Sequence, residues 1–399
     1  MAPLDRRTFI AGTAAWLGCA ASAEAFRPFG RRSEENTAGD IRGHIFKGDA
    51  PAQPGPWSHE AYRYEKMAEG RVVCAVCPHR CLLSPGDRSV CRSKVNLGGR
   101  LYTLAFGNPC AVHIDPVEKK PLYHFLPGIR VYSLAAAGCN FRCLNCQNWE
   151  ISQFTPEQVR HEPLAPEAAV AAAGRDGCRA VAYTYSEPIT FIEYMTAIAR
   201  PAKVAGLKNL WISNGYINSG PLADLCDLVD GANINLKAFN DDIYRALNGG
   251  RLAPVLETLK TLHARKVHLE ITNLVVPGYT DDLQMVHAMC RWIVENVGPD
   301  HPLHFLRFFP QYKLDRLAAT PVSTLERCRD IALAQGLRHV YIGNVPGHAA
   351  NHTYCHGCGR LIIERRGYQL PQYHLKDDAC AFCGAKIAGV WEEKVKAEK

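Results

Sequence analysis

The sequence predicts an α/β fold, a partial TIM-like barrel of about six strand–helix units, (β/α)6, with a small cysteine-rich module on either side. Apolar strands and amphipathic helices alternate between residues 128 and 347, which implies parallel strands joined by right-handed crossovers. Most of the 17 cysteines fall into three groups with metal-ligand spacing, one after the first barrel strand and one in each flanking module.

The expected barrel strands are apolar runs bounded by turn residues. The first lies at residues 131–134, and the others are expected at residues 180–185, 209–213, 232–237, 267–276, 303–309 and 339–342. Thr280 is expected to cap a helix with an apolar stripe, and Thr320-Pro321 is expected to open another. In such barrels the chemistry collects at the carboxyl ends of the strands.

The composition is that of an ordinary globular protein. Of 399 residues, 47% are hydrophobic and 21% are charged, and the formal net charge is +7. The positive excess comes without long basic blocks, so nucleic acid is not an expected partner. The cysteines are too sparse for a disulfide scaffold, and those outside the three groups are expected to be mostly small buried hydrophobes: Cys19, Cys110, Cys178, Cys226, Cys290 and Cys328.

Residues 1–26 have the layout of a secretory signal. Arg6-Arg7 precedes a modest apolar run and Ala21-Ser22-Ala23, which resembles a twin-arginine signal and predicts export to the periplasm. The alternative is an inert leader on a cytoplasmic protein. The run is too short for a transmembrane span. Residues 27–70 are rich in Gly and Pro and are interpreted as a linker with one short helix near residues 58–68.

The N-terminal module and its connector are expected at residues 71–127. Cys74, Cys77, Cys81 and Cys91 provide four soft ligands, enough for tetrahedral zinc or for a second iron–sulfur cluster. His79 is a less favoured substitute ligand. In the connector, the charged run at residues 118–120 is interpreted as a solvated surface, with partner binding as the alternative.

The C-terminal module is expected at residues 348–399. Cys355 and Cys358 form one knuckle, and Cys380 and Cys383 form a second. Two such pairs with this separation are typical of a zinc ribbon. A purely structural role is favoured over a docking surface.

Cys139, Cys143 and Cys146 form the central group, in a loop that follows the first barrel strand. Three thiolates from one short loop would leave one iron of an iron–sulfur cube without a protein ligand and open to a small molecule. The motif Cys-x3-Cys-x2-Cys resembles the radical SAM signature, in which that open iron is chelated by S-adenosylmethionine. The alternative is a structural zinc loop.

Polar residues follow or end the later strands. They are Glu187 after the second strand, Ser213 and Asn214 after the third, Lys237 on the fourth, His287 in the helix after the fifth, and His304 and Arg307 on the sixth. With the cysteine loop at the first strand, they predict a site on one rim of the barrel.

From residue 74 onward the chain resembles the radical SAM enzyme of the AmmeMemoRadiSam system, a family related to pyruvate formate-lyase activating enzymes. The resemblance rests on the N-terminal cysteine pattern, residues 115–125, residues 146–153 and the terminal ribbon. It implies that Glu187 takes the methionyl ammonium, that Ser213 and Asn214 lie near the ribose, and that Lys237 and His287 hold the methionyl carboxylate. Tyr185-Ser186 stands where the activating enzymes have Gly-Gly, Ile212 precedes Ser213 in place of an aspartate, and Asn235 replaces the aspartate of Asp-Leu-Lys.

The resemblance also implies the activity. A [4Fe-4S] cluster, reduced by a low-potential donor such as flavodoxin or ferredoxin, would cleave S-adenosylmethionine to a 5′-deoxyadenosyl radical. That radical would abstract hydrogen from an unidentified substrate, expected to be linked to the Memo proteins, with no catalytic side chain beyond the cluster and S-adenosylmethionine. The alternatives are an activase of a glycyl-radical enzyme and a non-catalytic electron-transfer or zinc-ribbon binding protein.

Overall fold

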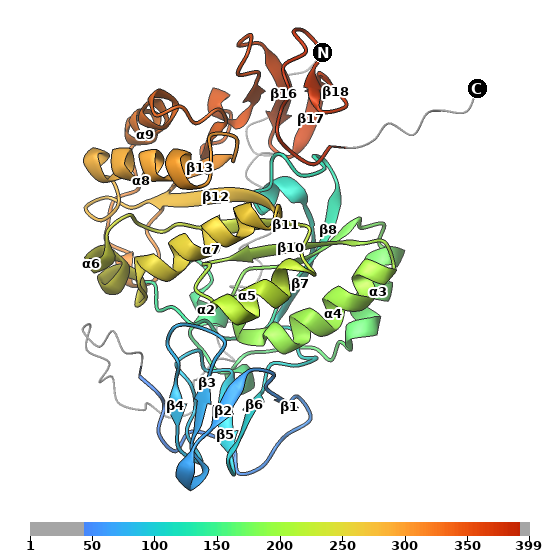
Figure 1. Ribbon diagram of the computed structural model, residues 1–399, viewed down its shortest axis with the longest axis vertical. Coiled ribbons are helices and arrows are strands. Elements are labelled where there is room, and N and C mark those ends of the chain that lie inside the picture. The colour runs from blue at the N-terminus through green and yellow to red at the C-terminus, as the bar shows by residue number, and fades with distance from the viewer. Residues whose placement is uncertain (1–43, 392–399) are drawn as a thin grey trace, which may run out of the picture. The chain divides into compact units, whose positions relative to one another are not determined.

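The centre of the molecule is an eight-stranded sheet in the order β14-β13-β12-β11-β10-β9-β8-β7 (Figure 1), seen in a computed structural model that describes residues 44–391. Strands β8 to β14 run parallel to their neighbours, and β7 pairs antiparallel to β8. The strands are β7 (Ala111–Pro116), β8 (Arg130–Ala135), β9 (Ala180–Tyr183), β10 (Lys208–Ser213), β11 (Gly231–Asn235), β12 (His268–Val275), β13 (Leu303–Arg307) and β14 (Val340–Gly343). The predicted α/β class with a parallel sheet is confirmed. Strand β7 was not foreseen, because its sequence alternates polar and apolar residues within a charged segment.

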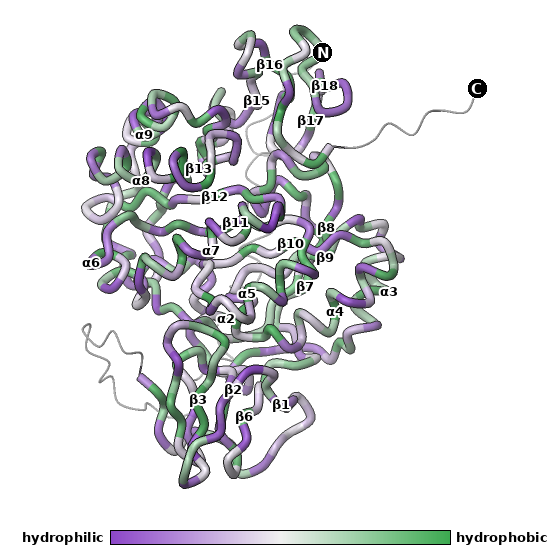
Figure 2. The backbone as a smooth tube through the Cα atoms, in the orientation of Figure 1, coloured by the Kyte–Doolittle hydropathy of each residue, from purple (hydrophilic) through white to green (hydrophobic). Residues whose placement is uncertain are grey.

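Helices connect the parallel strands. They are α2 (Trp149–Ser152), α3 (Pro166–Arg175), α4 (Ile192–Val204), α5 (Ser219–Cys226), α6 (Asp241–Ile243), α7 (Leu252–Ala264), α8 (Leu283–Asn296) and α9 (Val322–Ala334), with short turns η3 (Val117–Lys119), η4 (Pro156–Gln158), η5 (Pro188–Phe191), η6 (Tyr244–Asn248), η7 (Tyr312–Leu314) and η8 (Ala349–Asn351). Figure 2 shows hydrophobic and hydrophilic residues alternating along these helices, as expected of helices that bury one face. No helix of the described part is long and apolar enough to cross a membrane.

Two local predictions were wrong. Asp282, not Thr280, caps α8, and its carboxylate accepts a hydrogen bond from the Gln284 amide. Thr280 instead closes the preceding turn, because its hydroxyl donates to the carbonyl of Leu274 and accepts from the amide of Val276. In place of the helix expected near residues 58–68, the structure has two short strands followed by a 3-10 turn. The two strands pair with strands of the cysteine-rich segment.

The N-terminal strands form two three-stranded sheets. One contains β1 (His59–Glu60), β6 (Arg100–Thr103) and β5 (Lys94–Leu97), and the other contains β2 (Tyr64–Lys66), β3 (Val72–Cys74) and β4 (Leu82–Leu83), with η2 (Ala68–Gly70) between β2 and β3. Their apolar side chains belong to the same hydrophobic cluster as the central sheet. The segment at residues 59–66, expected as linker, therefore packs with the cysteine-rich strands.

The C-terminal strands carry their own small apolar core. They are β15 (Thr353–Tyr354), β16 (Leu361–Arg366), β17 (Gln369–Tyr373), β18 (Leu375–Lys376) and β19 (Ala379–Cys380). The predicted signal segment at residues 1–26, the first part of the predicted linker and the last eight residues lie outside the described residues.

Burial differs from expectation in one charged segment. Glu118 and Lys120 were expected on a solvated surface, but they are only 3% and 4% exposed. Lys120 Nζ lies 2.6 Å from Asp115 Oδ2, so its charge is paired inside the protein. Among the scattered cysteines, Cys178, Cys290 and Cys328 are buried, as expected.

Candidate active site

The loop of Cys139, Cys143 and Cys146 leaves the carboxyl end of β8 and is held by the turn η6. The amides of Arg142 and Leu144 donate to carbonyls of η6 at 2.8 and 2.9 Å. Phe141, 1% exposed, anchors the loop against Gly250, where an added Cβ would lie 2.3 Å from its ring. The aromatic residue inside the motif thus fixes how the loop folds.

N–H donors are directed at the sulfurs of this loop. The Phe141 amide donates to Cys139 Sγ at 3.3 Å, and the Asn248 side-chain amide donates to Cys143 Sγ at 3.2 Å. Burial, reinforced by the nearby Glu187 carboxylate, raises the pKa of Cys139 well above its ordinary value, and burial raises the pKa of Cys146 to about 11. Bare thiolates would be unfavourable here, so the N–H donors suit sulfurs whose charge is shared with a bound metal centre.

Glu187 is a buried carboxylate in the segment after β9, where it caps η5. It is 2% exposed and accepts hydrogen bonds from the Ser213 hydroxyl at 2.7 Å, the Asn214 amide at 2.9 Å and the Ile189 amide at 3.2 Å. Burial raises the pKa of Glu187 to about 7, although these hydrogen bonds and the Lys237 charge oppose the rise. Its environment favours a cationic ligand group, which would offset the cost of the buried charge.

Ser213 and Asn214 serve to position Glu187. The Ser213 hydroxyl donates to Glu187, and the Asn214 side chain donates to Asn140 Oδ1 at 2.7 Å and accepts from the Tyr216 amide at 2.9 Å. These hydrogen bonds give both residues a role in orienting Glu187, and their predicted position near the ribose stays a prediction.

Lys237 lies two residues beyond β11 and is half-buried. Its positive charge lowers the pKa of both Glu187 and Cys146, so its ammonium lies within electrostatic range of the carboxylate and of the cysteine loop. Asp241, the first residue of α6 and the next acidic residue after Lys237 in the sequence, pairs with Arg245 at 2.7 Å. Over residues 44–391 Lys237 forms no salt bridge, so its ammonium is free to meet an anion.

His287 is not part of this group. It lies on an exposed face of α8, where Gln335 Nε2 donates to His287 Nε2 at 2.9 Å. The buried stripe of α8 passes through Val286, Cys290 and Ile293, and position 287 is rotated about 100° from Val286, toward α9. The prediction that His287 holds the methionyl carboxylate is therefore corrected: its ring binds Gln335 on the outside of α8.

His304 lies away from this group, whereas Arg307 is the last residue of β13 and uses its side chain to hold a neighbouring loop. His304 Nε2 lies 2.6 Å from Glu270 Oε2, and Glu270 also accepts from the amides of Tyr123 and His124. Arg307 donates to the carbonyl of Thr320 at 2.8 Å. The Glu270 group lies near the beginnings of β12 and β13, away from the carboxyl ends that carry the cysteine loop.

Sequence reasoning missed three asparagines. Asn248 reaches Cys143, and Asn140 binds Asn214 and donates to the carbonyl of Tyr216. Asn273 donates to the carbonyl of Leu236, while its Oδ1 is buried and has no partner among the described residues. For Asn273 the available signal was a lone amide in an apolar strand.

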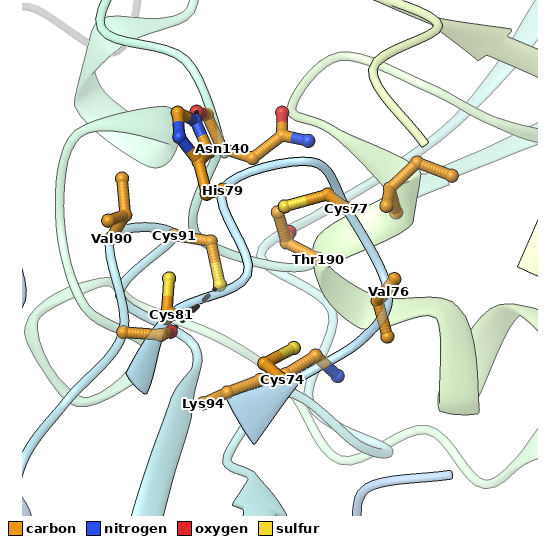
Figure 3. Close-up of a pocket in the computed structure, with 12 residues that line it drawn as sticks. Cys74, Val76, Cys77, His79, Cys81, Val90, Cys91, Lys94, Asn140 and Thr190 are labelled. Atoms are coloured by element: carbon orange, nitrogen blue, oxygen red, sulfur yellow. Dashed lines mark hydrogen bonds between the residues drawn. The ribbon is translucent and has the colours of Figure 1, made fainter. Parts of the chain in front are cut away.

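The two flanking cysteine groups have different geometries. The sulfurs of Cys355, Cys358, Cys380 and Cys383 all lie within 4.8 Å of one another. Cys74, Cys77, Cys81 and Cys91 line a cavity (Figure 3). In neither group does the structure contain a disulfide.

Comparison with known proteins decides the class. The model of the radical SAM superfamily matches residues 134–290, which include the cysteine loop, Glu187 and Lys237. The chain is a radical SAM enzyme. It is 43% identical over 330 residues to the uncharacterized protein MJ0808 of Methanocaldococcus jannaschii, covering 82% of this chain and 98% of that protein, and the two belong to one family.

The enzyme is also similar to activating enzymes. It is 28% identical over 223 residues to pyruvate formate-lyase 1-activating enzyme of Escherichia coli K12, covering 51% of this chain and 89% of that protein. Among solved structures, a domain of pyruvate-formate lyase-activating enzyme from Bacteroides vulgatus matches with a TM-score of 0.37 and 14% identity, covering 41% of this chain and 99% of that one.

Proposed function

We propose that the enzyme binds a [4Fe-4S] cluster at Cys139, Cys143 and Cys146, and S-adenosylmethionine between that loop, Glu187 and Lys237. The observation that carries the proposal is the arrangement of charge. The buried Glu187 carboxylate is linked to the cysteine loop through Asn214, which binds both Glu187 and Asn140. The Lys237 ammonium, which forms no salt bridge within residues 44–391, lies within electrostatic range of both. An amino acid moiety has the complementary pair of charges.

Different residues are proposed to bind different groups of S-adenosylmethionine. Glu187, aligned by Ser213 and the Asn214 amide, accepts hydrogen bonds from the methionyl ammonium. Lys237 donates to the methionyl carboxylate, and Asn273 Oδ1 offers an acceptor deeper in the sheet. Asn248 and the Phe141 amide stabilise the sulfur charge. A cluster held by Cys139, Cys143 and Cys146 would supply the electron for cleavage of S-adenosylmethionine to methionine and a 5′-deoxyadenosyl radical.

Our proposal for the substrate of that radical rests on residues 115–125 and 146–153. These two segments resemble motifs of the AmmeMemoRadiSam enzyme. We therefore favour hydrogen abstraction from a substrate linked to the Memo proteins. The second candidate is activation of a glycyl-radical enzyme, supported by the similarity to pyruvate formate-lyase 1-activating enzyme. The electron donor is proposed to be a flavodoxin or ferredoxin.

The remaining parts of the proposal concern architecture. The central sheet is the partial (β/α)6 barrel, and the ribbon cysteines bind zinc, since their Sγ–Sγ distances of 3.6 and 3.9 Å suit a single tetrahedral ion. The leader at residues 1–26 directs export of the folded protein to the periplasm, with retention in the cytoplasm as the alternative.

The test is cleavage of S-adenosylmethionine by reconstituted protein under dithionite. The parent should produce 5′-deoxyadenosine, and Cys143→Ala should lose both this product and the absorbance of the cluster at the Cys139 loop. Cys178→Ala, a change at a buried cysteine outside the groups, is the control. Cleavage by Cys143→Ala at the parental rate would refute the cluster assignment. A glycine-centred radical formed in an added glycyl-radical enzyme, but no reaction with Memo proteins, would favour the second candidate.

A further inference from the structure

Cys74, Cys77, Cys81 and Cys91 line one shared cavity. Figure 3 shows the four side chains around the same space, supplied by the end of β3 and by the loops on both sides of β4. Three of them are less than 9% exposed, Cys77 is half-buried, and all four are free thiols. Buried thiols that face a shared cavity rather than one another form a ligand set.

The ribbon group provides the scale expected for one metal ion. Tetrahedral zinc, with Zn–S bonds of about 2.3 Å, holds its sulfurs about 3.8 Å apart. The ribbon sulfurs match this spacing. Within residues 44–391, no three sulfurs of the N-terminal group lie within 4.8 Å of one another. Their wider arrangement around a cavity suits a body larger than one ion.

We propose that this cavity holds a second [4Fe-4S] cluster, with one of the four cysteines on each iron, and that it passes electrons to the cluster at the Cys139 loop. The proposal rests on the function proposed above. Because every iron has a protein ligand, this second cluster has no open position for S-adenosylmethionine or substrate. Electron transfer is the chemistry that such a site retains.

The cavity lining brings a buried ion pair and two hydroxyl groups close to the cysteines. Lys94 lies at the cavity and is 1% exposed, and its ammonium contacts both carboxylate oxygens of Glu193 at 2.6 Å. The hydroxyl oxygens of Ser89 and Ser93 lie 3.0 and 3.3 Å from Cys91 Sγ. Hydrogen bonds to sulfur and nearby charge are the means by which a protein sets a cluster's potential.

The two cysteine sites are in direct backbone contact. Gly138 immediately precedes Cys139, has φ of +105°, and packs on Cys91 so closely that an added Cβ would lie 2.5 Å from the Cys91 carbonyl oxygen. His79 Nε2 lies 2.7 Å from the carbonyl oxygen of Asn140, the residue after Cys139. Cys91, a proposed ligand of the second cluster, therefore lies next to Cys139, a proposed ligand of the first, where the N-terminal module packs on the barrel.

The electron balance is simple. A one-electron donor of the ferredoxin or flavodoxin class, or dithionite in the assay, reduces the second cluster by one electron. That electron then reduces the cluster at the Cys139 loop, and the second cluster returns to its oxidised state. No bond forms or breaks in this step.

The first test is metal content of the full-length chain, purified without oxygen and reconstituted. The parent should hold about eight irons, four for each cube, and about one zinc. A variant with Cys139, Cys143 and Cys146 changed to Ala should keep about four irons, with a reduced electron paramagnetic resonance signal that S-adenosylmethionine does not alter. Two zincs in the parent, or no iron in this variant, would overturn the proposal. All of the parental iron in this variant would instead refute the cluster of the proposed function.

The second test addresses contact between the clusters. Cys74→Ala/Cys81→Ala should lose about half of the iron, whereas Cys178→Ala should lose none. If the clusters adjoin at Gly138, the spectrum of the reduced parent should show magnetic interaction and differ from the sum of the two single-cluster variants. A parental spectrum equal to that sum would refute the relay.

Discussion

Glu187→Gln removes the negative charge of the Glu187 side chain while keeping nearly the same size and shape. In the parent, the carboxylate has a pKa of about 7 before ligand binds, because burial disfavours its charge. The methionyl ammonium binds the ionised form, so affinity should be constant just above pH 7 and fall as the pH drops below it. Above about pH 8 the ligand's own α-amino group loses its proton, and affinity should fall again.

The size of the effect follows from linkage. A charge-assisted hydrogen bond contributes about 1.5–3 kcal/mol, which is roughly 10- to 150-fold in affinity. The same energy lowers the pKa of Glu187 in the complex by about one to two units. The acid limb should therefore begin near pH 7 and level off near pH 5 to 6, with a total loss equal to that caused by Glu187→Gln at pH 7.5.

The assay is calorimetric titration of S-adenosylmethionine into the oxidised, reconstituted protein at equal cluster loading. Glu187→Gln should bind more weakly at pH 7.5 and lack the acid limb, whereas Glu257→Gln, a change at an exposed glutamate paired with Lys260, should match the parent. A parental acid limb retained by Glu187→Gln would show that another group titrates and would refute the reasoning.

Stability of the ligand-free protein gives an independent reading of the same pKa. The folded-state pKa lies above the ordinary value of 4.5, so between pH 4.5 and 7 the unfolded chain loses this proton first and stability falls. Above pH 7 the accumulated cost is about 3 kcal/mol. Glu187→Gln should remove that decline, seen as a smaller difference in unfolding midpoint between pH 5 and pH 8. Equal declines in parent and variant would place the pKa of Glu187 near its ordinary value.

Three further predictions concern other parts of the chain. Lys237→Met should keep the fold and weaken S-adenosylmethionine binding by about 1.5–3 kcal/mol, measured by the same titration with Lys260→Met as control, and equal affinities would leave the ligand carboxylate with another partner. Cys380→Ser together with Cys383→Ser should release about one zinc and expose the C-terminal segment to protease, whereas unchanged zinc content would count against a zinc ribbon. Changing Arg6-Arg7 to Lys-Lys should retain the unprocessed chain in the cytoplasm, and identical fractionation of both chains would indicate an inert leader.

The sequence allowed the parallel strands to be located because each contains an apolar run between turn residues. Strands β8 to β14 all overlap the expected ranges, since burial on both faces leaves little room for polar residues. The short strands at residues 59–66 could not be found this way. Each spans only two or three residues, and its pairing partner is set by tertiary contacts.

The site was predictable where the residue type itself carries the chemistry. Cys139, Glu187 and Lys237 stood out as reactive or charged groups just beyond strand ends, and hydrogen bonds through Asn214 and Asn140 place Glu187 beside the cysteine loop. The prediction for His287 was wrong because the spacing of a residue from a motif does not specify which face of a helix its side chain occupies. Asn248 was missed because it lies far along the chain from Cys143, and only folding brings them together.

The substitution of Tyr185 for glycine shows how the chain's own motifs support the site. Tyr185 has φ of +64°, a left-handed conformation that costs a non-glycine residue about 1–3 kcal/mol. Its hydroxyl donates to Asp115, and its carbonyl accepts from the Asn148 side chain at 2.7 Å. Asp115 in turn pairs with Lys120 at 2.6 Å.

These contacts join two segments that looked unrelated in the sequence. Residues 115–125 place the Asp115–Lys120 pair beneath Tyr185, and Asn148 comes from the segment that follows the cysteine loop. The strained residue is therefore held from both sides, two positions before Glu187. The segments at residues 115–125 and 146–153 thus fix the backbone that orients the Glu187 carboxylate. This explains physically why both segments accompany the binding site.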